Sequence, residues 1–297
     1  MNGVLKVSRT TLVVFIVPCM LFYAGLVLYP IAMSLWYSLL DWNGIGTGEF
    51  IGLKNYQEAL MNDPIFWNSL KNTLIYVVTA MGQVAFALFI AILMSLFVKR
   101  SNFLVSSYFM PVILSVVVIG QLWKSIYNPA SSGGMLSSLL LSMGLDSWVK
   151  DWLADSATAT YALAFVLVWQ YFGYHLLIQF TGLQNVPEDL YEAAKIDGAS
   201  GFQTVRNITL PLMMPVIKIS VVLATIGSLK SFELVMAMTG GGPANLTEVL
   251  SSHFYNVSFQ TFRSGYGSAI STILIILCFA LTFLVNLSFR RSEKALS

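Results

Sequence analysis

The residue types best suited to binding a ligand occur in a short run inside a long apolar segment, Trp169-Gln170-Tyr171-Phe172-Gly173-Tyr174-His175. An amide in hydrocarbon is costly unless it faces protein or a water-filled cavity, so these side chains are expected to face inwards. Aromatic rings can pack on the apolar C–H face of a sugar while Gln170 and the tyrosine hydroxyls bond its hydroxyl rim. The alternative is hydrogen bonding between helices, which is common for Gln, Tyr and His.

A second polar cluster occurs in the next apolar segment, Gly227-Ser228-Leu229-Lys230-Ser231-Phe232-Glu233. Lys230 and Glu233 are three residues apart and can share a helix face, where pairing would lower the cost of keeping both charges in a membrane. They either face a pore together or lie near the outer end of the segment, where Lys reaches water and the pair is structural. The cluster lacks the glycine that precedes lysine in a phosphate-binding loop, so we do not expect this chain to hydrolyse ATP.

No set of residues suggests a metal site or a hydrolase. The chain has two histidines and two cysteines, Cys19 and Cys278, which are far apart and lie in apolar segments. These four residues are too few and too far apart in the sequence to suggest a zinc site, and there is no G-x-S-x-G motif for a nucleophilic serine. We therefore expect no metal, no cofactor bound by this chain and no enzyme activity. An enzyme embedded in the membrane is a weak alternative.

A polar loop separates the two clusters. Its first helix is expected to start at about Pro187, with two acidic residues in the first turn, and to end at Gly198 in the left-handed conformation. Ser200 followed three residues later by Gln203 is a capping-box pattern, so a second short helix should run towards Arg206. The local pattern alone is that of a helix, a glycine bend and a helix, which also fits an amphipathic connector on a membrane surface.

The spacing within this loop resembles the EAA signature of ABC-importer permeases. Glu192-Ala193-Ala194 is followed after three residues by Gly198, after nine more by Ile208 and after one more by Leu210-Pro211. In that family the loop is the coupling helix that docks on a cytoplasmic ATPase. The resemblance therefore assigns the ATPase-coupling role to five residues: Glu192, Ala193, Ala194, Asp197 and Gly198.

The flanking segments are similar to one branch of that family, the sugar permeases of the carbohydrate-uptake type, and to the first permease of maltose and glycerol-phosphate importers in particular. The matching segments are Gly182 to Pro187, Thr239 to Pro243 and Phe50 to Tyr56, and the resemblance covers nearly the whole chain. It implies an all-α integral membrane protein with about six transmembrane helices in the type I ABC importer fold. It also favours a set of substrate-pathway residues: Gln170, Tyr171, Tyr174, Ser228, Lys230, Ser231 and Glu233.

The resemblance implies partners as well. They are a second permease in a heterodimer, two ABC ATPase subunits that bind ATP and Mg, an extracellular solute-binding protein, a carbohydrate substrate and membrane lipid. The substrate stays open among mono-, di- and oligosaccharides, acidic sugars and glycerol phosphates, because Lys230 and Glu233 admit a charged sugar. We expect His175 to be a packing residue.

The composition agrees with a membrane protein. The 297 residues are 57% hydrophobic and only 10% charged, with a mean hydropathy of +0.74, whereas about 25% of the residues of soluble domains are charged. The net charge of +2 is small and the basic residues are scattered, so we expect no nucleic-acid binding.

Six apolar segments are long enough to cross roughly 30 Å of hydrocarbon. The first, residues 11–33, is too long for a signal-peptide core, with Pro18 and Pro30 expected to mark a kink and an end. The others span residues 70–98, 103–126, 157–181, 212–238 and 267–289. We therefore divide the chain into a first helix with an external loop (1–69), an ABC transporter transmembrane domain (70–290, with the EAA loop at 187–211) and a tail (291–297).

Basic residues set the expected orientation, because cytoplasmic loops carry an excess of them. The side of the EAA loop carries Lys6, Arg9, Lys99, Arg100, Lys195, Arg206, Arg290, Arg291 and Lys294. The opposite side carries Lys54, Lys71, Lys124, Lys150 and Arg263. Both termini and the EAA loop are thus predicted to be cytoplasmic, in a multi-pass protein of the bacterial cytoplasmic membrane.

The external loops carry further expectations. The first should hold a short helix near residues 55–61. In the second, Trp148 and Trp152 are four residues apart and would form a stripe on one helix, which we interpret as an interfacial anchor rather than a sugar platform. Three glycines and Pro243 should end the helix of the fifth span.

The strongest rival function is an ion-coupled secondary sugar transporter. Such proteins place acidic or other ion-binding groups near mid-membrane, and Glu233 is the only carboxylate within the predicted spans. A secondary transporter would also have no use for an ATPase-docking loop, and nothing suggests the selectivity ring of a channel. The sequence therefore favours a permease subunit of an ATP-driven sugar importer.

Overall fold

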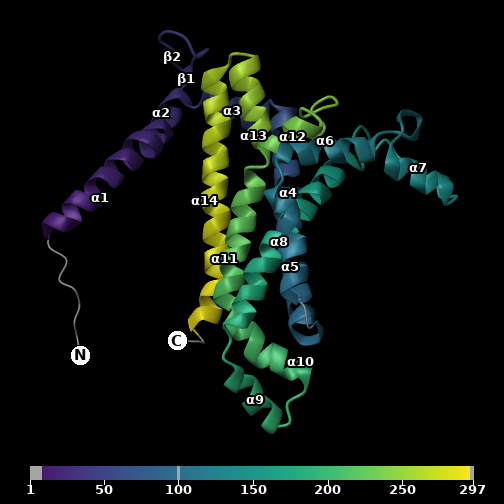
Figure 1. The fold of residues 1–297 in the computed structure, drawn as a ribbon. Helices are drawn as coiled ribbons and strands as arrows, with labels where there is room; N and C mark the ends of the chain where they lie inside the picture. Colours follow the sequence, from purple (N-terminus) through teal and green to yellow (C-terminus); the bar gives the residue numbers. More distant parts are fainter. Residues whose placement is uncertain (1–8, 99–100, 295–297) are drawn as a thin grey trace. The chain divides into compact units, whose positions relative to one another are not determined.

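The computed structural model describes residues 9–98 and 101–294, and the chain is mostly helical over these ranges (Figure 1). Lys6, Lys99, Arg100 and the last three residues of the predicted tail lie outside the described residues. The described chain separates into two compact units. The smaller comprises residues up to Asp63 together with Phe254–Ile273, and the larger comprises Pro64–His253 together with the part of the chain from Leu274.

The smaller unit begins with a long apolar helix built from α1 (Arg9–Tyr23), a π-helical turn (Ala24–Leu28) and α2 (Tyr29–Tyr37). The predicted first span is confirmed, but Pro30 does not end it. Pro30 lies in the first turn of α2, where a proline ring is tolerated. The π-helical turn directly before it is a local adjustment that lets backbone groups left unpaired by proline find other partners. None of the most apolar stretch of this helix, Val13–Tyr37, is buried.

Polar contacts hold the rest of the smaller unit together. It contains the two-stranded ladder of β1 (Leu40–Asp41) and β2 (Glu49–Phe50), then α3 (Lys54–Met61), which confirms the predicted short helix. The buried Asn55 amide donates to the carbonyl oxygens of Ser38 and Leu40, both at 2.9 Å. Arg263 donates to both carboxylate oxygens of Glu58, at 2.8 and 2.7 Å, and these bonds raise the pKa of the guanidinium.

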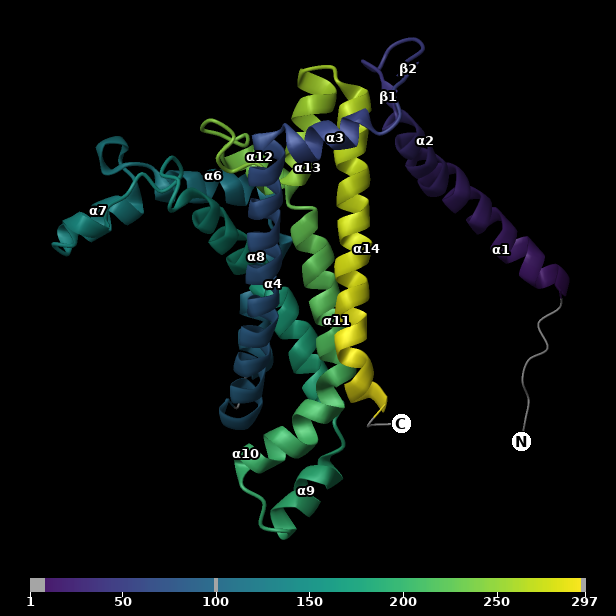
Figure 2. The same cartoon turned by 180° about the vertical axis from the view of Figure 1, so that it is seen from behind.

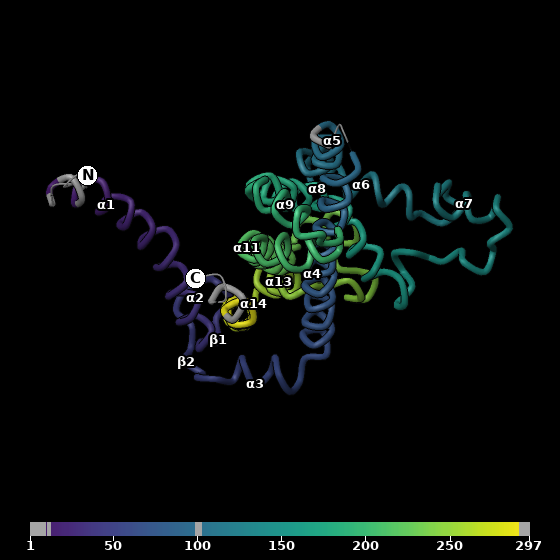
Figure 3. The backbone as a smooth tube through the Cα atoms, turned by 90° about the horizontal axis from the view of Figure 1, so that it is seen from below, coloured from purple at the N-terminus to yellow at the C-terminus, as the bar shows by residue number. Residues whose placement is uncertain are grey.

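The larger unit is a helical bundle. Its long members are α4 (Pro64–Phe97), α8 (Ala159–Gln184) and α11 (Leu210–Leu229), which lie side by side (Figures 1 and 3). Buried alanines of α4, with Leu176 and Phe180 of α8 and Met213 of α11, form one apolar core. The close contact of α8 and α11 depends on Gly182, where an added Cβ would lie 2.9 Å from Met213 and Val216 side-chain atoms.

Two of the predicted spans differ from straight helices. The third consists of α5 (Ser101–Ile113) and α6 (Val116–Tyr127), which bend by 94° at a break after Pro111. The fifth does not run to Met238 as one helix, because α11 ends at Leu229 and α12 (Phe232–Met238) starts after a break. By length and composition the described chain therefore has five helices able to cross a membrane, or six if the bent pair counts as one span.

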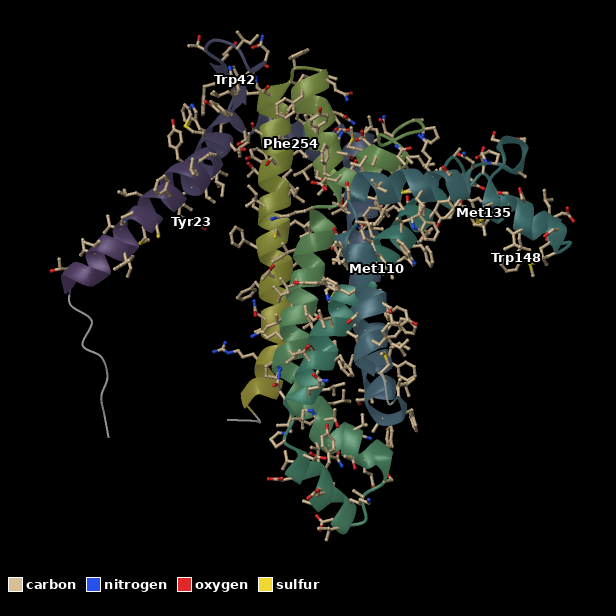
Figure 4. All side chains as sticks on the ribbon, in the orientation of Figure 1. Tyr23, Trp42, Met110, Met135, Trp148 and Phe254 are labelled. Carbon is tan, nitrogen blue, oxygen red and sulfur yellow. The ribbon has the colours of Figure 1, made fainter. Side chains whose placement is uncertain are left out.

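The segment between α6 and α8 does not form the predicted tryptophan stripe. It contains a 3-10 turn (Ala130–Ser132), α7 (Met135–Ser142) and a second 3-10 turn (Asp146–Trp148). Trp148 lies on this segment with 66% of its side chain exposed (Figure 4), while Trp152 donates from Nε1 to the Ser137 hydroxyl at 3.2 Å. The two rings share no helix, so that prediction was wrong, and an anchoring role for Trp148 stays a prediction.

The glycine-rich loop after α12 is tightly bonded to α4. Gly240 and Gly241 have φ angles of +62° and +87°, which confirms that the helix ends there. The Asn72 amide donates to the carbonyl oxygens of Leu246 and Glu248, both at 2.8 Å. The chain then continues through α13 (Leu250–Tyr255), a π-helical turn (Asn256–Gln260) and α14 (Ser264–Lys294).

Candidate functional site

A cavity of about 370 Å³ lies in the larger unit, between α4, α8, α11 and the break before α12. Five of the seven predicted substrate-pathway residues line it together: Tyr171, Tyr174, Ser228, Lys230 and Glu233. Two of them belong to α8, before the EAA loop in sequence, and the other three to α11, the break after it and α12, which follow that loop. The structure therefore brings the two polar clusters into one site, a proximity that the spacing of residues within each cluster could not predict.

The other two predicted residues are buried beside the cavity and do not line it. Gln170 is 1% exposed and Ser231 is 6% exposed. Neither the Gln170 Oε1 nor the Ser231 hydroxyl has a hydrogen-bond partner in the described structure. Gln170 precedes Tyr171 on α8, and successive residues of a helix point about 100° apart, so the two side chains leave α8 in different directions. Their role in the pathway stays a prediction.

Lys230 and Glu233 reach the cavity from different elements. Lys230 lies in the break between α11 and α12, with φ −98° and ψ 21°, whereas Glu233 belongs to the first turn of α12. The prediction that they share a helix face was therefore wrong, because α11 ends before Lys230 and α12 begins after it. Both are exposed in the single chain, and within the described residues no ion pair joins them.

His175 has a partner on α11. Its Nδ1 lies 2.8 Å from the hydroxyl of Ser220, and both side chains are buried. His175 also lines the cavity. The bond thus links α8 and α11 directly beside the site, which is more than the packing role expected from the sequence.

Helix α4 contributes residues to the cavity that no sequence pattern singled out. Tyr76, Thr79 and Gln83 line the same cavity from that helix. Their spacing of three, four and seven residues is that of one helix face, so the signal was present in the sequence. It was overlooked because single polar residues in an apolar segment hardly change its average hydropathy.

The EAA loop folds as its sequence predicts. It consists of α9 (Glu188–Ile196), α10 (Gly201–Thr204) and a π-helical turn (Val205–Thr209), and it projects beyond the last turn of α4 (Figures 1 and 2). Gly198 has a φ of +73°, and the Ala199 amide donates to the Ala194 carbonyl at 2.9 Å. This is the bonding of a glycine-terminated helix.

The second helix of the loop starts with the predicted capping box. The Gln203 amide donates to the Ser200 hydroxyl at 3.3 Å, and the Ser200 amide donates to the Gln203 side chain at 2.7 Å. Two backbone donors that a helix start leaves unpaired are satisfied in this way. Pro187 precedes α9 in an extended conformation, so the helix starts at Glu188, one residue after the predicted start.

The two faces of the loop differ in character. The inner face carries the buried Ala194 and the half-buried Tyr191. The Tyr191 hydroxyl lies 3.2 Å from the Thr209 hydroxyl, and both residues line a hollow of about 600 Å³. Glu192, Ala193, Asp197 and Gly198 are exposed. Two large apolar side chains are exposed as well, Ile196 at 86% and Phe202 at 73%. The exposed face of the loop therefore carries both charged and large apolar side chains.

Known proteins give an independent comparison. The model of the family described as "Binding-protein-dependent transport system inner membrane component" matches residues 59–296. The chain is 37% identical over 284 residues to the probable ABC transporter permease protein YurN of Bacillus subtilis (strain 168), which covers 94% of this chain and 96% of YurN. It is 31% identical over 280 residues to the lactose transport system permease protein LacF of Rhizobium radiobacter, with 91% of each chain covered.

Among solved structures, the chain resembles one of a bacterial alginate ABC transporter in complex with a periplasmic protein that holds an alginate pentasaccharide. The TM-score is 0.81 over 95% of this chain and 94% of that chain, at 18% sequence identity. At this identity the likeness concerns the fold, and it agrees with the predicted type I importer architecture.

Proposed function

The chain belongs to the family of binding-protein-dependent transport system inner membrane components, the permeases of ABC importers, and we propose that its cargo is a carbohydrate. The observation that carries this proposal is the cavity shared by Tyr171, Tyr174, Lys230 and Glu233. The lactose permease relative supports the same class of cargo. Nothing in the comparisons favours an ion-coupled transporter.

The chemistry of the cavity suits a polyhydroxylated ligand without a strong net charge. Tyrosine rings offer flat apolar surface, while their hydroxyls, Ser228 and the two charged groups offer hydrogen bonds. Lys230 and Glu233 face the same space with opposite charges. Each can make a charge-assisted bond to a hydroxyl, and together they give no net attraction for an anion. We therefore favour a neutral sugar over an acidic one.

The energy for transport comes, in this proposal, from two ABC ATPase subunits that bind ATP and Mg and dock on the EAA loop. The exposed Ile196 and Phe202 support this assignment, since such side chains gain free energy when a partner covers them. Ala193 is exposed and small, so it permits close contact. Glu192 and Asp197 supply charge at the rim.

Closure of the ATPase subunits would displace the loop and rock the helices that flank it. Such a displacement favours one state of the cavity only if the loop binds the ATPases differently in the two states. The bonds between Tyr191 and Thr209 and between His175 and Ser220 support the transmission, because both connect the two sides of the loop. The cavity would accept sugar from outside in one state and release it inside in the other.

The remaining partners follow from the same proposal. Lys230 and Glu233 are exposed in the single chain, so a second, similar permease is needed to close the pathway. An extracellular solute-binding protein delivers the sugar. Basic residues near the loop, including Lys195, Arg206 and Arg290, favour a cytoplasmic location for the loop and for both termini.

The test is purification of the tagged chain from its native membrane in mild detergent, followed by mass spectrometry. Wild type should recover an ABC ATPase and a second permease, and Glu192→Lys should lose the ATPase. The matched control is Asp151→Lys, the same reversal of charge at an exposed site far from the loop in sequence. A chain recovered alone, which moves sugar in liposomes under an ion gradient, would overturn the proposal.

A further inference from the structure

We infer that the outer end of the smaller unit is a docking surface for an extracellular protein that presents basic side chains around an apolar pocket. The inference rests on the proposed function, in which that protein is the solute-binding protein of the importer. We call this end of the unit the outer surface. It is defined by four residues, Asp41 and Glu49 of the hairpin and Phe259 and Phe262 of the segment before α14.

Phe262 has a backbone conformation that phenylalanine rarely adopts. Its φ is +55°, in the left-handed region, at the end of a helical turn where the Arg263 amide donates to the Val257 carbonyl at 3.0 Å. Glycine is the usual residue at such a helix end, because it has no Cβ to oppose the left-handed conformation. The ring buries little surface within the chain to offset this cost, since Phe262 is 63% exposed, and Phe259 is 59% exposed.

The hairpin carries a second feature that is unfavourable in the single chain. Asp41 lies directly opposite Glu49 in the two-stranded ladder, and both are exposed. Like charges in facing positions of an antiparallel pair destabilise the pair. A partner with basic side chains would turn this repulsion into attraction. Over residues 38–63 and 254–266 the acidic residues Asp41, Glu49, Glu58 and Asp63 outnumber the basic residues Lys54 and Arg263.

The hairpin and the segment before α14 lie side by side. The Gly265 amide donates to the Trp42 carbonyl at 2.8 Å, and a Cβ added at Gly265 would collide with the Leu40 carbonyl oxygen. Only glycine permits this close approach. Figure 1 shows the hairpin next to the first turn of α14. The exposed ring and the facing carboxylates are therefore available to one partner.

The length of α14 indicates that the bilayer is not this partner. Its apolar span runs from Ser264 to Arg290, about 39 Å at 1.5 Å per residue, whereas the hydrocarbon of a bilayer is about 30 Å thick. With Arg290 at the inner boundary, Ser264 lies roughly 9 Å beyond the outer one, and Phe262 precedes Ser264 on that side. Lipid tails therefore do not cover the ring, and the acidic residues repel anionic headgroups.

Two substitutions favour the single chain and remove what the partner would bind. Phe262→Gly relieves the left-handed strain and removes the ring, while Glu49→Lys places opposite charges across the ladder. If these residues serve only the fold, both variants work as well as wild type. If they dock a partner, both impair its binding although the chain is no less stable. The matched control is Ala244→Gly, since Ala244 is exposed and also left-handed, with a φ of +47°.

The experiment uses the complete importer in lipid nanodiscs and measures ATP hydrolysis as purified, sugar-loaded solute-binding protein is added. Phe262→Gly should raise the half-saturating concentration of that protein about tenfold with an unchanged rate at saturation, whereas Phe262→Trp should stay within about twofold of wild type. Glu49→Lys should raise it about fivefold at low salt and less at high salt, because salt screens the charges. Ala244→Gly should match wild type.

Melting curves of each complex without the binding protein establish that the variants fold, and we expect no loss of stability. Wild-type half-saturation for both Phe262→Gly and Glu49→Lys would overturn the docking surface. A lower melting temperature for Phe262→Gly with unchanged half-saturation would also overturn it and would assign the ring to the bilayer. Failure of the binding protein to stimulate the wild-type complex would count against the proposed function itself and is seen before any variant is compared.

Discussion

Replacement of Gly198 by alanine isolates the bend of the coupling loop from everything else in the chain. Gly198 has a φ of +73°, and a Cβ added there meets no atom within 4 Å. The substitution therefore creates no clash, and its cost is that of a left-handed L-residue, about 1–2 kcal/mol. That free energy shifts the balance between the native bend and its alternatives by roughly five- to thirtyfold.

Gly201→Ala is the matched control, because an added Cβ there also meets no atom and Gly201 is not at a positive φ. Gly201 is the first residue of α10, where alanine favours the helix. We expect Gly198→Ala to lower sugar uptake about tenfold, with the chain still in the membrane and sugar capture by the binding protein intact, and Gly201→Ala to leave uptake unchanged. Equal uptake by the two variants would refute the reasoning that the bend transmits force.

Three further predictions follow from other contacts. Ser220→Ala removes the hydrogen-bond partner of the buried His175 at a cost of about 1–3 kcal/mol. Because this bond connects the helices on the two sides of the EAA loop, the number of ATP molecules hydrolysed per sugar transported should rise in proteoliposomes. Ile196→Ser should reduce the ATPase recovered on purification without reducing the amount of permease; full recovery would mean that the exposed side chain is not part of the contact. Asn55→Leu should lower the thermal stability of the purified complex more than Arg263→Ala. Asn55 makes buried hydrogen bonds, whereas Arg263 makes a half-exposed ion pair worth about 0–1 kcal/mol. Melting curves of the two variants at two salt concentrations make the comparison.

The features that could be predicted from the sequence are those that depend on neighbours along the chain. The end of α9 at Gly198 and the capping box of Ser200 and Gln203 involve residues within one or two helical turns, so their types and spacing suffice. The apolar spans are equally local. The same holds for the polar clusters, whose residue types alone indicated that they avoid lipid.

The features that escaped prediction depend on three-dimensional context. Hydropathy averaged over a span does not reveal a break, because apolar residues continue on both sides of Lys230 and on both sides of the bend after Pro111. Which polar residues share a cavity depends on helix packing. Gln170 was expected in the pathway and is buried beside it, while Gln83 was overlooked and lines it.

The long apolar helix of the smaller unit has a consequence for the biogenesis of the protein. Val13–Tyr37 has a mean hydropathy of 2.1 and buries none of its most apolar stretch within its own unit, so a bilayer can accept it without the help of that unit. The insertion machinery can release it into lipid as soon as it emerges from the ribosome. The fifth span, with Lys230 at its interruption, needs neighbouring helices that keep this charge away from lipid. Synthesis from the N-terminus thus offers the apolar helix to the bilayer early and leaves the charged interruption of the fifth span until helices able to shelter it are in place.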